Sequence, residues 1–132
     1  MSVQVESLLP GDAFDQNCPT RVVLDHVTSK WAVLVLVALL EDGETRFSAL
    51  RRRVGGVSEK MLAQTLRTLE ADGFLSRRVV PATPPQVSYA LTDLGRGITE
   101  HLAGLVGWIN ARIPEVESIR RAGRPDPGAR SA

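Results

Sequence analysis

The stretch that decides the fold is residues 46–78, RFSALRRRVGGVSEKMLAQTLRTLEADGFLSRR. Apolar residues at helical spacing predict two helices within it. Between them Gly55 and Gly56 break the chain, Ser58 is a good N-cap for the second helix, and Gly73 ends that helix. Two helices joined by a tight, glycine-containing turn are typical of a helix-turn-helix.

The charge is distributed unevenly along the chain. Residues 46–78 hold eight basic and three acidic side chains, a net charge of +5, whereas residues 1–45 hold two basic and seven acidic ones, a net charge of −5. A basic segment within a small, nearly neutral domain is common in proteins that bind nucleic acids. The alternative is that these charges are scattered over a solvated surface.

After Gly73 the pattern changes from a helical period to a period of two. Leu75, Arg77 and Val79 alternate along one segment, and alternation resumes over residues 87–91. The loop between them, residues 81–86 (PATPPQ), is stiffened by proline and can close a hairpin but cannot join a ladder. A hairpin directly after a helix-turn-helix is a wing.

Helices are also predicted on both sides of this unit. A short helix starts at Cys18 and Pro19 and ends near Thr28. The next helix, between Ser29 and Gly43, is apolar on all sides and therefore central to the core. A short strand is predicted at residues 44–46. The last helix begins at Thr92 and ends at Pro114.

That last helix carries more apolar surface than one domain needs. Its apolar residues recur at steps of three and four and form a wide stripe: Leu94, Ile98, Leu102, Leu105, Val106, Trp108, Ile109 and Ile113. One side can pack on the core, and the other needs a partner. We therefore predict a homodimer formed through the first and last helices; the alternative is burial within a single chain. The expected fold class is α+β, mainly α: a winged helix-turn-helix with flanking dimerisation helices.

The chain length of 132 residues fits one domain. We expect an N-terminal arm at residues 1–17, the domain at residues 18–114, and a flexible, Gly-, Pro- and Arg-rich extension at residues 115–132. No secretory signal is expected, and the longest apolar run, Trp31–Leu40, spans ten residues, about half of the ~20 needed to cross a bilayer. A cytoplasmic protein that does not contact a membrane is the expectation.

The candidate DNA-contacting residues lie on the helix-turn-helix and the wing. On the second helix, opposite its leucine stripe, Gln64 can pair with adenine and Met61 can touch a thymine methyl, whereas Lys60 and Arg67 can bind guanine or phosphate. The remaining candidates hold the DNA backbone or flank the base readers: Arg51, Arg52, Arg53, Ser58, Thr65, Arg77 and Arg78.

Cys18 is the candidate redox sensor. It is the single cysteine, and it precedes the first helix, where the helix dipole favours a thiolate. The alternative is an inert, buried thiol. No cofactor, metal site or catalytic residue is expected, because no zinc-helix, nucleophile-elbow, dinucleotide or paired-carboxylate motif is present.

Several separate blocks of sequence resemble the HxlR-type regulators, relatives of the MarR group. The resemblance covers roughly residues 18–110. The blocks that carry it are Cys18-Pro19, Lys30-Trp31, residues 46–52 (RFSALRR), residues 60–67 (KMLAQTLR), Leu69-Glu70, residues 72–75 (DGFL), Pro84-Pro85, Val87, Tyr89 and residues 91–95 (LTDLG).

The resemblance implies a homodimeric winged-helix DNA-binding protein, usually a repressor of a neighbouring gene, with members that respond to oxidants, quinones or electrophiles. The chain departs from the family at Gln86 and Ser88, where members often carry a basic and an acidic residue, so the wing tip lacks the charge that these members place there. Two alternatives stay open: control by a non-covalent small-molecule effector, or a winged helix used for contact with another protein. An enzyme is not expected.

Overall fold

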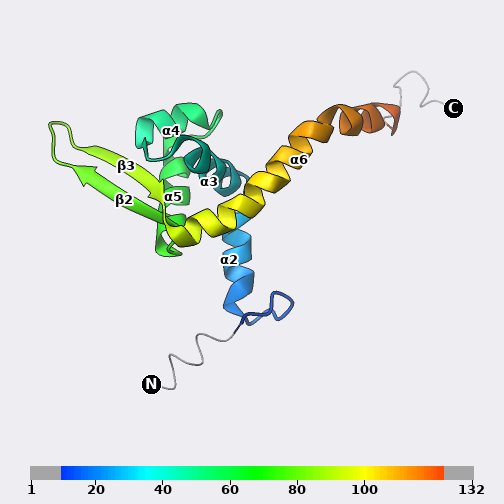
Figure 1. Ribbon diagram of the computed structural model, residues 1–132, viewed down its shortest axis with the longest axis horizontal. Coiled ribbons are helices and arrows are strands. Elements are labelled where there is room, and N and C mark those ends of the chain that lie inside the picture. Colours follow the sequence, from blue (N-terminus) through cyan, green and yellow to red (C-terminus); the bar gives the residue numbers. More distant parts are fainter. Residues whose placement is uncertain (1–9, 124–132) are drawn as a thin grey trace.

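The computed structural model describes residues 10–123 and is a winged helix-turn-helix (Figure 1). Its elements in chain order are α2 (Pro19–Val27), α3 (Lys30–Asp42), β1 (Thr45–Arg46), α4 (Phe47–Arg53), α5 (Glu59–Ala71), β2 (Leu75–Val80), β3 (Gln86–Leu91) and α6 (Asp93–Gly123). The predicted fold class is confirmed, and so are the predicted boundaries of α2, α3 and α5 to within a residue or two.

Helix α3 is the centre of the core, as its apolar sequence predicted. Val35, Leu36 and Leu39 are fully or almost fully buried, and α5 contributes Leu62 and Leu66 to the same cluster. Among the described residues no single helix is both long and apolar enough to span a bilayer; only α2 and α3 taken together, across a 71° bend, reach that length and hydropathy.

The three strands form an antiparallel sheet in the order β1-β3-β2. In the hairpin Leu75 pairs with Leu91, and Val80 pairs with Gln86. Gln86 was predicted in the loop, but it begins β3, because the prolines that cannot join a ladder end at Pro85. The hairpin projects away from the helices (Figure 1).

The start of α6 is fixed to the end of α5. The Thr92 hydroxyl donates to the Gly73 carbonyl at 2.6 Å and accepts from the Gly95 amide at 3.0 Å, which confirms Thr92 as the cap. Gly95 lies so close to Phe74 that an added Cβ would stand 1.9 Å from the Phe74 carbonyl oxygen. The packing of α6 on the winged helix therefore requires a glycine at this position.

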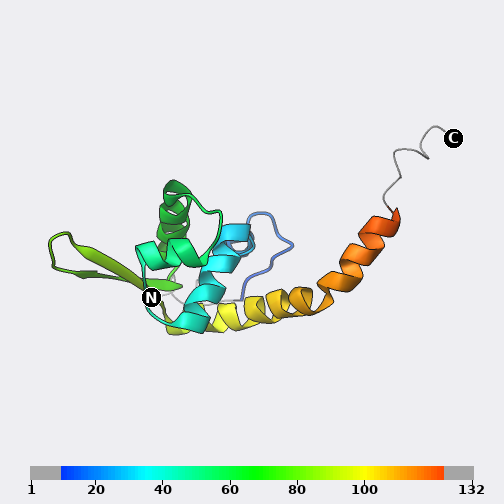
Figure 2. The ribbon, with the colours of Figure 1, turned by 90° about the horizontal axis from the view of Figure 1, so that it is seen from above.

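The prediction that the last helix ends at Pro114 is wrong. Helix α6 continues to Gly123, with Pro114 in its interior. Proline removes one helical hydrogen bond and bends a helix without ending it where the flanking residues favour helix. An ion pair between Arg112 and Glu115 spans Pro114, and a second one between Glu117 and Arg120 lies in the turn after it. Figure 2 shows the change of direction in the orange part of α6.

The predicted arm and extension are described only in part. Residues 12–18 form two consecutive turns, in which the Asp12 and Asp15 carboxylates accept the Phe14 and Asn17 amides. Of the predicted extension, residues 115–123 are helical; residues 1–9 and 124–132 lie outside the described part of the chain.

Candidate nucleic-acid interface

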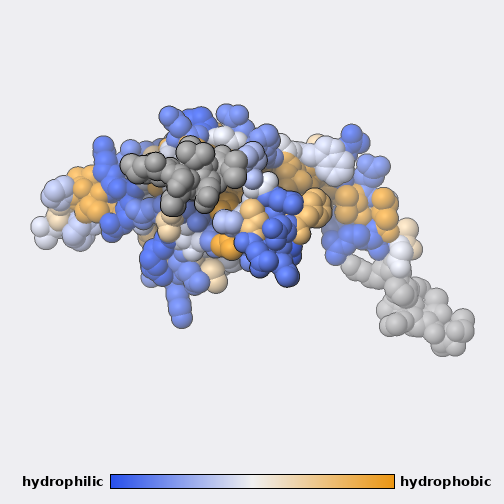
Figure 3. Space-filling model, turned by 90° about the horizontal axis from the view of Figure 1, so that it is seen from below, coloured by the Kyte–Doolittle hydropathy of each residue, from blue (hydrophilic) through white to orange (hydrophobic). Residues whose placement is uncertain are grey.

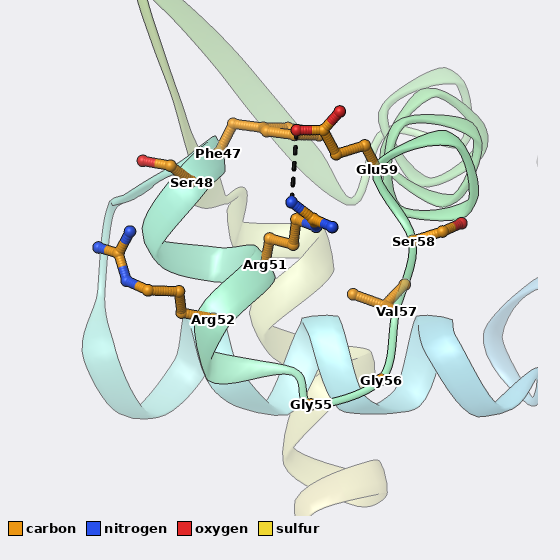
Figure 4. Close-up of a pocket in the computed structure, with 9 residues that line it drawn as sticks. All are labelled: Phe47, Ser48, Arg51, Arg52, Gly55, Gly56, Val57, Ser58 and Glu59. Carbon is orange, nitrogen blue, oxygen red and sulfur yellow. Dashed lines mark hydrogen bonds and ion pairs between the residues drawn. The ribbon is translucent and has the colours of Figure 1, made fainter.

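The turn of the helix-turn-helix is built by local signals. The Ser58 hydroxyl accepts the Met61 amide at 3.0 Å and so caps α5, as predicted. Gly56 has a φ of +90°, which favours glycine, and Val57 is buried beneath the turn. Figure 4 shows the open groove of about 600 Å³ that this turn leaves between α4 and α5, with Arg51 and Arg52 on the α4 side.

The exposed side of α5 carries most of the predicted base-reading residues. Lys60, Met61, Gln64 and Arg67 are exposed, and Met61 is 39% exposed although it is apolar. The predicted exposure of Thr65 is wrong, since only 9% of it is accessible. Thr65 lies four residues before Leu69 and three after Leu62, so it turns toward the buried stripe of the helix.

The three arginines of α4 differ in their surroundings. Arg53 is paired with two carboxylates at the end of α3, at 2.6 Å from Glu41 and 3.0 Å from Asp42. Arg51 stands 3.4 Å from Glu59 at the start of α5, and Figure 4 draws this contact. Arg52 is exposed and has no carboxylate within ion-pair distance in residues 10–123. It is therefore the α4 arginine with the most freedom to bind a phosphate.

The two arginines of the wing lie on opposite faces of β2. Arg78 is 3.2 Å from Glu44, which also accepts the Ser88 hydroxyl. Arg77 is exposed and has no ion pair within the described part of the chain. The acidic segment of residues 1–45 thus supplies counter-charges for Arg53 and Arg78, a pairing that the distribution of charge along the chain did not indicate.

Cys18 occupies the N-cap of α2 and is half-buried. Its sulfur accepts the Asp12 amide at 3.3 Å and contacts the Thr20 hydroxyl at 3.3 Å. Hydrogen bonding to Thr20, and then to the Asp12 amide, lowers the pKa of the Cys18 thiol, partly opposed by burial and by the Asp15 carboxylate. The start of α2 thus favours the thiolate form of Cys18. The sequence predicted this effect from the helix dipole, and the structure adds two hydrogen bonds to the sulfur.

A large apolar surface remains uncovered on the flanking helices. Trp108 is 60% exposed and Ile119 66%, and Figure 3 shows orange side chains along the distal part of α6. The exposed apolar residues of α2 and α6 are Val22, Leu24, Leu94, Leu105, Trp108, Ile109, Ile113, Val116 and Ile119. Of these, Val116 and Ile119 lie beyond the predicted end of the helix.

One histidine, His26, makes an ion-pair contact between two helices. His26 Nδ1 contacts Asp72 Oδ2 at 2.7 Å, which ties the end of α2 to the end of α5. Residues 10–123 contain no cluster of three or more side chains suited to hold a metal ion.

The family model described as HxlR-like helix-turn-helix matches residues 26–117. The chain belongs to the HxlR family. An uncharacterized HTH-type transcriptional regulator, YtfH of Escherichia coli strain K12, is 55% identical over 115 residues, which cover 87% of this chain and 90% of YtfH.

Solved structures of HxlR-type and related regulators share the fold. A putative transcriptional regulator, ytfH from Salmonella typhimurium, is 54% identical, with a TM-score of 0.80, and the match covers 85% of this chain and 99% of that one. The redox regulator HypR in its reduced form is 33% identical, with a TM-score of 0.67, over 76% of this chain and 98% of that one. This member of the HxlR family is a DNA-binding transcription regulator.

Proposed function

We propose that the protein is a homodimeric repressor that binds an inverted-repeat operator through α5 and is released from it by oxidation or alkylation of Cys18. The observation that carries the proposal is the exposed side of α5, a Ser58-capped helix that presents Lys60, Met61, Gln64 and Arg67. Side chains of these types hydrogen-bond or contact base edges in the major groove.

The proposed contacts fall into two groups. Gln64 binds adenine, Met61 packs on a thymine methyl, and Lys60 and Arg67 bind guanine or phosphate. Phosphates on the flanks are held by the first-turn amides after Ser58, by Arg52 on α4 and by Arg77 on the wing. Arg51, Arg53 and Arg78 make smaller contributions, because each already contacts a carboxylate of its own chain.

Dimerisation is proposed through the exposed apolar residues of α2 and α6. Leu105, Ile109 and Val116 follow one another on α6 at steps of four and seven residues, so they lie on one face of the helix, which a second helix can cover. A twofold dimer presents two α5 helices and fits half-sites about one helical turn, ~10 bp, apart.

Regulation through Cys18 is supported by its stabilised thiolate and by the likeness to the redox regulator HypR. Diamide takes two electrons and two protons from a pair of thiols, so Cys18 of two subunits, or Cys18 and a small thiol, would join as a disulfide. A quinone would instead add to the thiolate. A non-covalent effector that acts on the same helices is the alternative.

The test is fluorescence anisotropy with a duplex selected from a random library and with a scrambled duplex, each at two salt concentrations. We expect tighter binding to the selected duplex, and affinity that falls with salt on both duplexes. Failure to select any duplex would favour a winged helix used for protein contact.

The same assay after diamide treatment tests the sensor. The wild type should lose affinity, and Cys18→Ser should keep it. Equal affinity before and after treatment in the wild type, with Cys18 shown by mass spectrometry to be modified, would leave DNA binding in place and reject the thiol switch.

A further inference from the structure

A small cavity of about 180 Å³ lies beside the recognition surface, between the start of α3, the end of α2 and one side of α5. Gln64 and Met61, two of the proposed base readers, line it together with Thr65, Ser29 and Ala32. The cavity therefore lies next to the residues proposed to contact bases, and no residue of α4 lines it.

Ser29 and Ala32 bring the start of α3 to this cavity. Ser29 is the N-cap of a helix of 13 residues, but its hydroxyl caps no amide and donates instead to the His26 carbonyl at 3.1 Å. The amides of Lys30, Trp31 and Ala32, in the first turn, have no acceptor within the helix. Lys30 adds a positive charge to the same turn, with its Nζ 4.3 Å from the centre of the Trp31 ring.

Thr65 supplies a second and independent indication of a ligand. It is 91% buried, since 9% of its surface is accessible, and it lines the cavity. Its hydroxyl has no hydrogen-bond partner in residues 10–123, unlike the buried Thr99 hydroxyl, which donates to the Gly95 carbonyl at 2.6 Å. Within residues 10–123, every side-chain oxygen that is fully shielded from solvent has a hydrogen-bond partner. The Thr65 hydroxyl has none, so it is accessible, and it is accessible from the cavity that Thr65 lines.

We propose that this cavity binds a phosphate-type oxyanion, and that in the complex the anion is a backbone phosphate of the operator. Amides at a helix start and a hydroxyl donor are the groups that hold phosphate oxygens. A helix in the major groove has a phosphate strand on each side. Arg52 of α4 contacts the phosphate strand on one side of α5. The start of α3 contacts the phosphate strand on the other side. The inference rests on the proposed DNA binding, and it adds a phosphate contact on the second side of α5.

Asp25 lies on the rim of the cavity, and its carboxylate opposes an anion. It is exposed, so Asp25→Asn removes the repulsion with little effect on packing. The variant should bind DNA about two- to threefold more tightly at low salt, with a smaller gain at high salt because salt screens exposed charges.

The main test combines Thr65→Val with an operator in which single phosphates are replaced by uncharged methylphosphonates. Thr65→Val should weaken binding of the selected duplex about tenfold, the usual effect of losing a hydrogen bond to a charged group. One methylphosphonate per half-site should weaken binding by the wild type more than binding by Thr65→Val, because the variant has already lost one of the donors to that phosphate. Thr99→Val, which removes a buried hydroxyl far from the cavity, should leave DNA affinity unchanged, and thermal melting should show that both variants are folded.

A second measurement separates the two sources of the anion. Inorganic phosphate is titrated into the free protein, and amide chemical shifts of Ala32 and Thr65 are followed by NMR. If phosphate causes saturable shifts, but the methylphosphonate weakens the wild type and Thr65→Val equally at every position, the cavity binds a free anion and not a phosphate of the DNA backbone. Neither coupling nor shifts, in a protein that binds its selected duplex normally, would overturn the site and leave the proposed function standing. If no duplex is bound, the titration still tests the site.

Discussion

Gln64 illustrates how a single side chain sets what α5 can recognise. It is exposed in the middle of the helix, and its amide can make two hydrogen bonds to adenine. Gln64→Ala should therefore lower affinity for the selected duplex by about 1–3 kcal/mol and leave affinity for a scrambled duplex nearly unchanged. Anisotropy on the two duplexes measures both values, and an equal loss on both would assign Gln64 to the DNA backbone.

Cys18 is the residue whose ionisation can be followed directly. Its pKa is lowered chiefly by Thr20, so more of the thiol is ionised at neutral pH than in an ordinary cysteine. The rate of alkylation by iodoacetamide should rise with pH around a midpoint below the usual thiol value of about 8.5. Mass spectrometry of quenched samples gives this profile.

The contribution of Thr20 to the lowered pKa of Cys18 can be tested by substitution. Thr20→Val removes the largest cause of the lowered pKa, so the midpoint should move up and alkylation at pH 7 should slow. Thr28→Val removes a hydroxyl at the other end of α2, which donates to the Leu24 carbonyl, and should leave the profile unchanged. A midpoint that Thr20→Val does not move would reject Thr20 as the main cause and leave the Asp12 amide and the helix dipole to stabilise the thiolate.

At the scale of the elements, the contact between α6 and the end of α5 can be tested with two glycines. A Cβ at Gly95 would overlap the Phe74 carbonyl, whereas one at Gly97 meets nothing within 4 Å. Gly95→Ala should lower the free energy of unfolding by about 1–3 kcal/mol through overpacking. Gly97→Ala should raise it by up to ~1 kcal/mol through helix propensity. Urea denaturation at one protein concentration compares them, and equal effects would contradict the close contact.

Helix α4 offers a second matched pair. Arg52 has no ion pair in the described chain, whereas Arg53 is held by Glu41 and Asp42. Arg52→Gln should reduce the slope of log affinity against log salt by about 1, because one phosphate contact is lost. Arg53→Gln should change the slope much less. A larger change for Arg53 would show that its ion pairs open when DNA binds.

At the scale of the whole molecule, the uncovered stripe of α6 predicts the assembly. Ile109 lies in the middle of the exposed apolar residues, and Ala111 is exposed on the other side of the helix. Ile109→Glu should shift the protein toward monomer and weaken operator binding, because two half-sites can no longer be bound together. Ala111→Glu adds the same charge and should remain dimeric. Light scattering at micromolar concentration measures the mass, and a wild type that is already monomeric would reject the interface.

Signals that act over a few residues determined most of the fold. Ser58 and Gly73 delimit α5, and Thr92 caps α6. The change of the apolar pattern to a period of two after Gly73 predicts the wing. These features could be predicted because caps, turns and periodicity depend on near neighbours in the chain. The same locality explains the error at Pro114, where a rule for ending helices gave way to good helix formers on both sides.

Only the tertiary structure decided which of the predicted site residues are available. Arg53 and Arg78 contact carboxylates of the acidic segment 1–45, and Thr65 lines a cavity shared with the start of α3. An ion pair depends on two side chains being brought within a few ångströms, and burial depends on which element packs over a helix face, so neither follows from spacing along the chain. The sequence by itself determined the helices, the wing and the basic character of the middle segment. The packing of α3 against α4 and α5 decided which of those charges and hydroxyls remain free to bind.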